Sequence, residues 1–181
     1  MSPAYGFNTT DTLRAYVCLG SNMGERAGHL LLAVRGMMDA GLKIRRLSSV
    51  YETAPVDVLE QPAFLNMVAE LDGSTLPAPQ YVLGRLLRIE YALGRRRTKL
   101  ARGPRPIDLD LLLYGDEQRA TEFLTLPHPR LHLRRFVLVP LAELAPRLLH
   151  PKLGRTISQL LAETTDHSKV TRWKAERRDE G

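Results

Sequence analysis

The sequence predicts an α+β fold in which one sheet packs against helices. Apolar runs rich in β-branched and aromatic residues recur along the chain, segments with apolar residues at helical spacing separate them, and glycine or proline closes most segments. The 181 residues are 44% hydrophobic and 25% charged, which is usual for a globular protein and sufficient for one core. We therefore expect one domain over residues 13–165, a flexible lead over 1–12 and a charged tail, a solvated helix or frayed end, over 166–181.

The first half of the chain is predicted to contain three strands and one helix. Residues 15–20 are apolar and close on a glycine, which predicts a buried strand. A helix is expected from about Glu25 to Gly41, because apolar residues recur there at helical spacing. These residues are Leu30, Leu31, Val34, Met37 and Met38. Residues 42–52 and 65–71 are expected to form the second and third strands.

The connection between those two strands, residues 53–64, is long for a hairpin and contains prolines. Long connections inside compact domains are often functional, so this segment is a candidate ligand loop. The alternative is a tolerated surface insertion.

The second half begins with a helix predicted over residues 79–94, where Val82, Leu86, Ile89 and Leu93 follow a helical pattern. A strand is expected over 107–114, and short helices are expected over 136–144 and 157–163. The resulting order, β-α-β-β-α-β followed by short added helices, is that of a ferredoxin-like α+β sandwich.

The chain carries 26 lysines and arginines against 20 acidic residues, a formal charge of +6, which suits an anionic ligand of either phosphate or nucleic-acid type. Cys18 is the single cysteine, so an internal disulfide and a multi-thiolate metal site are excluded, and a reducing, cytoplasmic location is expected. The N-terminal residues lack a basic start followed by an apolar block, and no stretch of about 18 apolar residues occurs, so neither secretion nor membrane insertion is expected.

Two aspartates occupy alternate positions of the strand predicted over 107–114. Because side chains alternate along a strand, the apolar residues at 107, 109, 111 and 113 are expected on one face, and Asp108 and Asp110 on the other, about 7 Å apart. Magnesium is commonly held by one or two carboxylates and substrate phosphates, so this pair is a candidate Mg²⁺ site. The alternative is an ordinary half-exposed strand with a charged outer face.

A run of positive charge precedes the aspartates and consists of Arg95, Arg96, Arg97, Lys99, Arg102 and Arg105. No acidic residue interrupts it, and a bound polyphosphate would neutralise it through bidentate guanidinium contacts. A basic segment followed by paired carboxylates suits a nucleoside triphosphate with its metal. The P-loop motif is absent from the sequence. The alternative is a solvated basic surface.

Five short motifs resemble those of one enzyme family. They are LGSN at 19–22, SSVYET at 48–53, QPAFLN at 61–66, GPRPIDLD at 103–110 and PHP at 127–129. In this order and at these separations they resemble the motifs of 6-hydroxymethyl-7,8-dihydropterin pyrophosphokinase, an enzyme of folate biosynthesis. The resemblance covers about residues 14–150.

The resemblance implies a ferredoxin-like fold and transfer of the β,γ-pyrophosphate of ATP to the hydroxymethyl oxygen of the pterin, with release of AMP. It also implies two Mg²⁺ ions held by Asp108 and Asp110, with Arg95 and Arg105 as further catalytic residues. The implied ATP-binding residues are Glu90, Arg95, Arg97, Arg105, Ile107, Leu111, His128 and Arg134.

The implied pterin-binding residues are Thr53, Ala54, Val56, Phe64, Asn66 and Phe136. An amide such as that of Asn66 offers a donor and an acceptor to the edge of a ring, and Phe136 offers a stacking face. The alternatives are an ordinary core phenylalanine at 136 and a structural histidine at 128.

Two other functions are consistent with parts of the pattern. Ferredoxin-like sheets with basic loops bind single-stranded RNA, but aromatic residues are only 6% of this chain and no base-stacking consensus is present. A metal-dependent phosphohydrolase is the other alternative, and it would release phosphate or pyrophosphate from ATP without pterin. The expected partners are ATP and the pterin, without nucleic acid or membrane, and the expected state is a monomer.

Overall fold

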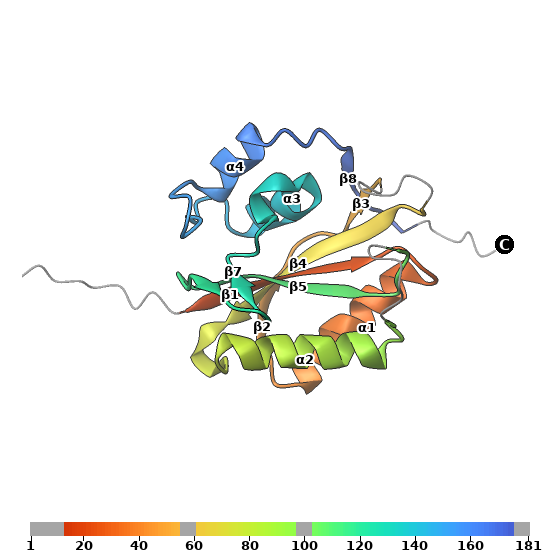
Figure 1. The fold of residues 1–181 in the computed structure, drawn as a ribbon. Helices are drawn as coiled ribbons and strands as arrows, with labels where there is room; N and C mark the ends of the chain where they lie inside the picture. The colour runs from red at the N-terminus through yellow and green to blue at the C-terminus, as the bar shows by residue number, and fades with distance from the viewer. Residues whose placement is uncertain (1–12, 55–60, 97–102, 176–181) are drawn as a thin grey trace, which may run out of the picture.

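The computed structural model describes residues 13–54, 61–96 and 103–175. Several predicted features lie outside these ranges: the site residues Val56, Arg97, Lys99 and Arg102, the lead over 1–12 and the tail beyond 175. Figure 1 gives the order of the elements. They are β1 (Arg14–Ser21), α1 (Arg26–Asp39), β2 (Ile44–Leu47), β3 (Tyr51–Thr53), β4 (Phe64–Asp72), α2 (Pro79–Ala92), β5 (Asp108–Tyr114), β6 (Arg119–Ala120), β7 (Thr125–Leu126), α3 (Arg135–Leu144), α4 (Ile157–Glu163) and β8 (Val170–Arg172), with short 3-10 turns at Gly73–Thr75 and Leu131–Leu133.

The main sheet is antiparallel, with the order β5-β1-β4-β3-β8, and β2 also pairs with β4. The prediction of one strand over 42–52 is wrong, because β2 and β3 are separate strands that pair with opposite ends of β4. Ser48 lies between them and exchanges two hydrogen bonds with the backbone of Val68, one through its N–H and one through its hydroxyl, both 2.9 Å. At the break between β2 and β3, the hydroxyl of Ser48 thus accepts the hydrogen bond from β4 that a backbone carbonyl would otherwise accept.

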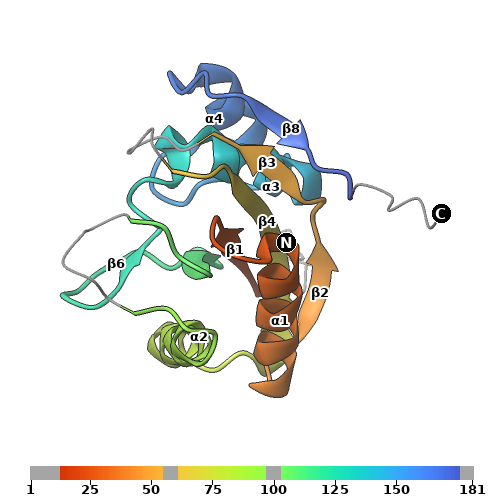
Figure 2. The same cartoon turned by 90° about the vertical axis from the view of Figure 1, so that its right-hand side faces the viewer.

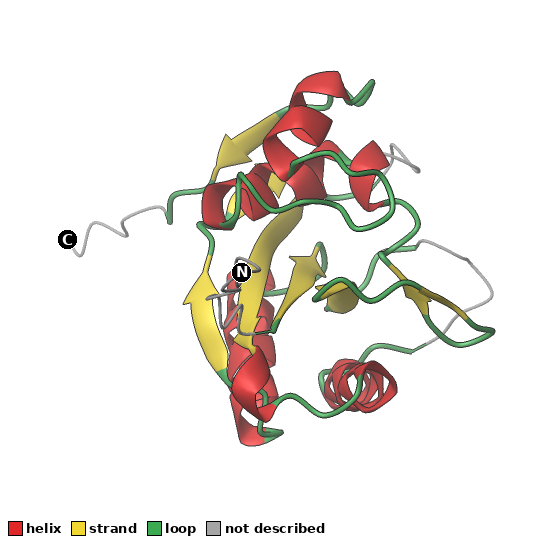
Figure 3. Ribbon diagram, turned by 90° about the vertical axis from the view of Figure 1, so that its left-hand side faces the viewer, coloured by secondary structure: helices red, strands yellow, loops and turns green. Residues whose placement is uncertain are grey.

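Helices cover both faces of the sheet (Figures 2 and 3). Helices α1 and α2 lie on one face, and α3 and α4 lie on the other. Strand β1 is central, so Val17 and Leu19 join the core under α1 and α2, while Tyr16 and Cys18 join the core under α3. Burial on both faces explains why β1 is a continuous apolar run rather than an alternating one.

The apolar face of α1 is narrower than its sequence suggests. Leu30, Ala33 and Met37 are buried, whereas Leu31 is 70% exposed and Met38 is 60% exposed. Both residues belong to the apolar pattern that predicts this helix, but their side chains lie outside the core. Helix α1 packs on the sheet and, at Gly36, on α2, where an added Cβ would lie 3.1 Å from Ile89, and Leu31 and Met38 lie outside both contacts.

A β-bulge interrupts β5 opposite Tyr16 and Val17. Leu109 and Leu111 face the core under α1 and α2, but Leu113 joins the opposite core, so its predicted place on the face of Leu109 is wrong. The extra residue of a bulge reverses the alternation beyond it. The two aspartates precede the bulge and keep their shared face.

The described part of the C-terminal tail, residues 166–175, is not a solvated helix or frayed end. Strand β8 pairs with β3, and the N–H of Trp173 donates to the carbonyl of Val50 at 2.9 Å. The folded unit therefore extends beyond residue 165. No helix in the described ranges is long and apolar enough to cross a membrane.

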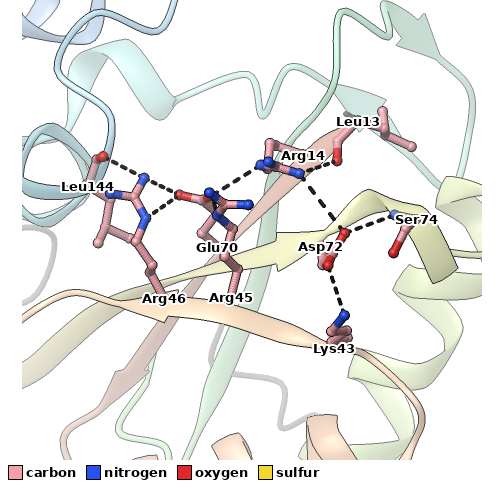
Figure 4. Close-up of polar contacts among 9 residues, drawn as sticks. All are labelled: Leu13, Arg14, Lys43, Arg45, Arg46, Glu70, Asp72, Ser74 and Leu144. Carbon is pink, nitrogen blue, oxygen red and sulfur yellow. Dashed lines mark hydrogen bonds and ion pairs between the residues drawn. The ribbon is translucent and has the colours of Figure 1, made fainter. Parts of the chain in front are cut away.

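A buried acid on β4 forms ion pairs with arginines of the neighbouring strands β1 and β2 (Figure 4). Glu70 on β4 is 1% exposed and contacts Arg14, Arg45 and Arg46. Arg46 also donates to the carbonyl of Leu144 at 2.8 Å, which joins β2 to the C-terminal end of α3.

Glu70 also affects Tyr16, the residue opposite it on β1. Burial, as the first cause, and the negative charge of Glu70, as the second, raise the pKa of Tyr16 to about 12.

Candidate active site

The two aspartates lie at the start of β5, where Asp108 is opposite Gly20 and Asp110 is opposite Cys18. Because both precede the bulge, their side chains share the face of the sheet that α3 covers further along. The predicted convergence of two carboxylates on one spot agrees with this register.

Two arginines hold the first aspartate. Arg105 donates through Nη2 to Oδ2 of Asp108 at 2.8 Å, and Nη1 of Arg95 contacts Oδ1. Gly94 ends α2 with φ +90°, a conformation that glycine adopts readily, and the turn brings the N–H of Arg95 to the carbonyl of Glu90 at 3.0 Å. The sequence thus directs Arg95 back toward β5.

Glu90, near the end of α2, completes this cluster. Its Oε1 accepts a hydrogen bond from the N–H of Leu109 at 2.6 Å and contacts Arg95. Burial raises the pKa of Glu90 to about 7, against the opposing effects of the Leu109 hydrogen bond and of Arg95, with Asp108 and Asp110 adding to the rise.

Asp110 lies in a poorly solvated position beside another acid. Burial, and then the charge of Asp108, raise its pKa to about 6, although Arg134, Arg105 and Arg95 act in the opposite direction. A divalent cation would remove this repulsion, so the donor set suits a hard metal ion with oxygen ligands. Within the described residues no cluster of three or more acidic, histidine or cysteine ligands occurs, so phosphate oxygens and water would complete the coordination.

A cavity of about 330 Å³ lies beside the acids. Residues from α2, from β5 and from the β6–β7 hairpin line it. They are Leu83, Leu87, Glu90, Arg95, Asp108, Leu109, Asp110, Leu111, Thr121, Glu122, Phe123, Leu124, Thr125, His128 and Pro129. Of the predicted nucleotide residues, Glu90, Arg95, Leu111 and His128 thus line the cavity, whereas the side chain of Ile107 is buried in the core under α1 and α2.

His128 is held beside β5 by a hydrogen bond from its N–H to the carbonyl of Leu112, 2.8 Å long. Burial first, then Arg134 and Arg130, lower its pKa to about 4, so the ring is neutral near pH 7. Nδ1 accepts from the N–H of Arg130 at 3.2 Å. The proton of the neutral ring therefore lies on Nε2, which can donate to a ligand oxygen.

A second polar cluster lies on β3 and β4. Asn66 donates through Nδ2 to the hydroxyl of Thr53 at 2.8 Å, and both side chains are buried. The Oδ1 atom of Asn66 lies over Gly20, where a Cβ would come within 2.7 Å. The glycine of β1 therefore leaves the space that the amide occupies.

Two arginines lie over aromatic rings, and one of them, Arg105, also contacts Asp108. The guanidinium of Arg105 lies 5.5 Å from the centre of the Phe64 ring, and that of Arg134 lies 5.4 Å from the ring of Phe136. Such cation–π pairs favour contact between the guanidinium and the face of the ring. Arg105 therefore contacts Asp108 and Phe64 at once, which joins the acid cluster to the cluster of Thr53 and Asn66.

The chain matches a known family over most of its length. The model of the family described as 7,8-dihydro-6-hydroxymethylpterin-pyrophosphokinase (HPPK) matches residues 16–146. The chain belongs to this family. The membership predicted from the five motifs is confirmed.

Relatives of two sizes are similar to this HPPK family member. The 2-amino-4-hydroxy-6-hydroxymethyldihydropteridine pyrophosphokinase of Aquifex aeolicus is 37% identical over 150 residues, 83% of this chain and 91% of the relative. The Bacillus subtilis protein of the same name is 43% identical over 135 residues, covering 74% and 79%. The folic acid synthesis protein fol1 of Pneumocystis carinii is 38% identical over 160 residues, 88% of this chain but 21% of the relative. The chain therefore spans about a fifth of that longer relative.

Solved structures share the fold. The wild-type HPPK-DHPS of Plasmodium falciparum superposes with a TM-score of 0.64 at 17% identity, covering 86% of this chain and 45% of that one. At this identity the likeness concerns the fold: a mixed α/β structure with an antiparallel sheet.

Some residues of this HPPK family member escape prediction from the sequence. The hairpin residues 121–125 and Leu83 line the cavity, yet no motif marks them. Asn22 is buried and accepts from the N–H of Arg105 at 2.9 Å while donating to Gln61 at 3.1 Å, so it ties three loops together. The position of Asn22 within the LGSN motif is the sequence signal that could have identified it.

Ala54, a predicted pterin-binding residue, is exposed and directly follows the end of β3.

Proposed function

We propose that this chain transfers the β,γ-pyrophosphoryl group of ATP to the hydroxymethyl oxygen of 6-hydroxymethyl-7,8-dihydropterin, releasing AMP, in folate synthesis. Family membership and the names of the full-length bacterial relatives support this reaction. The observation that carries it is the pair of Asp108 and Asp110, bordered by Arg95 and Arg105, between a cavity and the polar cluster of Asn66.

In this proposal Asp108 and Asp110 hold two Mg²⁺ ions. When bound, the ions offset negative charge on the phosphate oxygens and so favour departure of AMP. The like charge and poor solvation around Asp110 support this role, because a cation relieves both. Arg95 and Arg105, which contact Asp108 in this structure, would turn toward phosphate oxygens as cations take over the carboxylates.

The nucleotide is proposed to occupy the cavity between α2 and the β6–β7 hairpin. Leu83, Leu87 and Phe123 offer apolar surface to a base, and His128 offers an Nε2 donor to a phosphate or ribose oxygen. Arg134 and the arginine at 97 are further proposed phosphate contacts, with Glu90 fixing Arg95. For Ile107, whose side chain is buried, the proposal is limited to a backbone contact.

The pterin is proposed to bind beside Asn66 and Thr53, and Ala54 and Val56 are further proposed pterin contacts. The amide of Asn66 donates to the hydroxyl of Thr53, and an amide offers both donors and an acceptor, which suits the polar edge of a heterocycle. Phe64 and Phe136 offer flat faces for stacking, and an arginine lies near each ring. The hydroxymethyl group would then point toward Asp108, since Arg105 bridges the two clusters.

The finer structural expectations belong to the same proposal. The strand order around β1 supports a ferredoxin-like core with α3, α4 and β8 added. We infer one catalytic domain that acts as a cytoplasmic monomer and binds no nucleic acid.

One assay separates this reaction from its rivals. Protein, ATP, Mg²⁺ and the hydroxymethyl pterin are incubated together, and AMP and the pterin pyrophosphate are quantified. The proposal predicts equal amounts of both products and no AMP when the pterin is omitted. A phosphohydrolase would release phosphate or pyrophosphate without pterin, and an RNA-binding module would show salt-dependent RNA affinity without turnover. Either outcome would contradict the proposal.

A further inference from the structure

The segment over residues 164–173 lies beyond the part of the chain that the family model matches. Figure 1 shows it running from α4 across α3 to β8. It contacts two elements that carry proposed substrate residues: the first turn of α3, which carries Phe136, and strand β3, which ends at Thr53.

At its first contact, Asp166 caps helix α3. Its Oδ2 accepts from the N–H of Arg135 at 2.7 Å, and its Oδ1 accepts from the N–H of Ser168 at 2.9 Å. Arg134, the N-cap residue of α3, supplies no side-chain cap of its own. A carboxylate at this position satisfies an N–H of the first turn and interacts favourably with the helix dipole. Burial acts to raise the pKa of Asp166, but these hydrogen bonds outweigh it and lower the pKa.

At its second contact, the same segment extends the sheet. Val170 pairs with Thr53 and Arg172 pairs with Tyr51 in the β3–β8 ladder. Thr53 in turn accepts the hydrogen bond of Asn66. The segment therefore spans the distance between α3 and β3, with Asp166 fixed at one end and the ladder at the other.

We propose that Asp166 is a positioning residue for the pterin. By capping α3 it holds Arg134 and Phe136 at a fixed place relative to β3, so that the stacking ring and the polar pair of Thr53 and Asn66 face one ligand. This inference rests on the proposed function. A cap that merely stabilises the fold would lower the melting temperature without a preferential effect on the pterin.

The test compares Asp166→Ala with Thr156→Ala, which removes an equivalent cap from helix α4. Thr156 accepts from the N–H of Gln159 at 3.2 Å in a capping box remote from β3. Pterin and ATP-analogue affinities are measured by calorimetric titration for both variants. We expect Asp166→Ala to weaken pterin binding about fivefold, the equivalent of one lost cap, and Thr156→Ala to change it less than about twofold. Equal effects of the two variants on the pterin would overturn the proposal.

The Asp166→Asn variant keeps the proposal testable if Asp166→Ala fails to fold. It keeps one acceptor oxygen for the N–H of Arg135 and should weaken pterin binding by less than Asp166→Ala does. Pterin affinity for Asp166→Asn as low as for Asp166→Ala, or lower, would contradict the proposal.

Hydrogen exchange separates failure of this inference from failure of the proposed function. Without any ligand, Asp166→Ala should speed amide exchange in residues 135–138 but not in 157–160, and Thr156→Ala should do the reverse. Unchanged exchange at 135–138 in Asp166→Ala would overturn the positioning role even in an active enzyme. Wild-type protein that binds no pterin would contradict the proposed function, while the exchange result would still decide whether Asp166 holds the first turn of α3.

Discussion

Glu90 accepts a hydrogen bond from the N–H of Leu109, the residue between the two aspartates of β5, at 2.6 Å. This contact fixes the end of α2 to the strand that carries the acids, and the same oxygen contacts Arg95. A single buried carboxylate thus sets the positions of an acid strand and of a basic side chain.

Glu90→Ala should lower both stability and nucleotide affinity. The buried N–H of Leu109 would lose its acceptor, at a cost of about 1–3 kcal/mol in the free energy of unfolding. Glu90→Gln keeps an acceptor for Leu109 and should recover most of the stability but less of the nucleotide affinity, since the charge opposite Arg95 is lost. Denaturant titration and calorimetry measure the two effects. Equal stability of the Ala and Gln variants would contradict this role.

Asp110→Asn should abolish pyrophosphoryl transfer and leave pterin binding largely intact. The substitution keeps the shape of the side chain but removes the charge that would hold a cation. It should not destabilise the metal-free protein, because it also removes the repulsion between Asp110 and Asp108. Turnover is read as AMP release and stability as the melting temperature in EDTA. Near-wild-type AMP release would contradict the metal-binding role.

Gly20→Ala should weaken pterin binding with little effect on the ATP analogue. The added Cβ would lie 2.7 Å from Oδ1 of Asn66 and would displace the amide from its place beside Thr53. Gly84→Ala is the matched control, because no atom lies within 4 Å of its added Cβ. It should stabilise α2 by about 0.5–1 kcal/mol and leave both affinities unchanged. Unaltered pterin affinity in Gly20→Ala would show that Asn66 does not contact the ligand.

Phe123→Ala should weaken the nucleotide analogue and not the pterin. Phe123 is 82% exposed on the β6–β7 hairpin yet borders the cavity, so its removal costs little stability. Loss of stacking on a base is worth about 1–3 kcal/mol. Tyr81→Ala, at a site that is 64% exposed on α2 and does not line the cavity, should have no effect on either ligand. A similar loss in both variants would place the base elsewhere.

Glu143→Gln should destabilise the protein at neutral pH and much less in acid. Glu143 accepts hydrogen bonds from Tyr51, at 2.7 Å, and from Ser49. Burial acts to raise its pKa, but these bonds outweigh it and lower the pKa from 4.5. A lowered pKa means that the stabilisation is present above pH 4.5 and is lost as the pH falls through the folded-state value. Melting temperatures at pH 7 and pH 3 test this, and an equal deficit at both would contradict it.

Local sequence patterns correctly predicted the elements in which side chains follow a regular helical spacing or a regular strand alternation. Helix α2 follows its apolar spacing from Pro79, and Gly94 adopts the positive φ that ends it. The shared face of Asp108 and Asp110 followed from strand alternation alone. Both features depend on neighbours within a few residues.

Features set by distant partners could not be predicted in the same way. Leu113 changes face because of a bulge opposite Tyr16, and Leu31 is exposed because α2 and the sheet take only one stripe of α1. Strand β8 is short and polar, so no local pattern in the sequence predicts it. It forms because it pairs with β3, which lies more than a hundred residues earlier in the chain. The cavity likewise depends on the β6–β7 hairpin folding over α2.

The most direct test of the account is a titration of Mn²⁺, followed by electron paramagnetic resonance, with a non-hydrolysable ATP analogue present. The wild-type protein should bind Mn²⁺ tightly only with the analogue, and a variant carrying Asp108→Asn and Asp110→Asn should lose that binding while remaining folded. Equal Mn²⁺ affinity of the wild type and this variant would contradict the claim that the two carboxylates anchor the metal of a bound triphosphate.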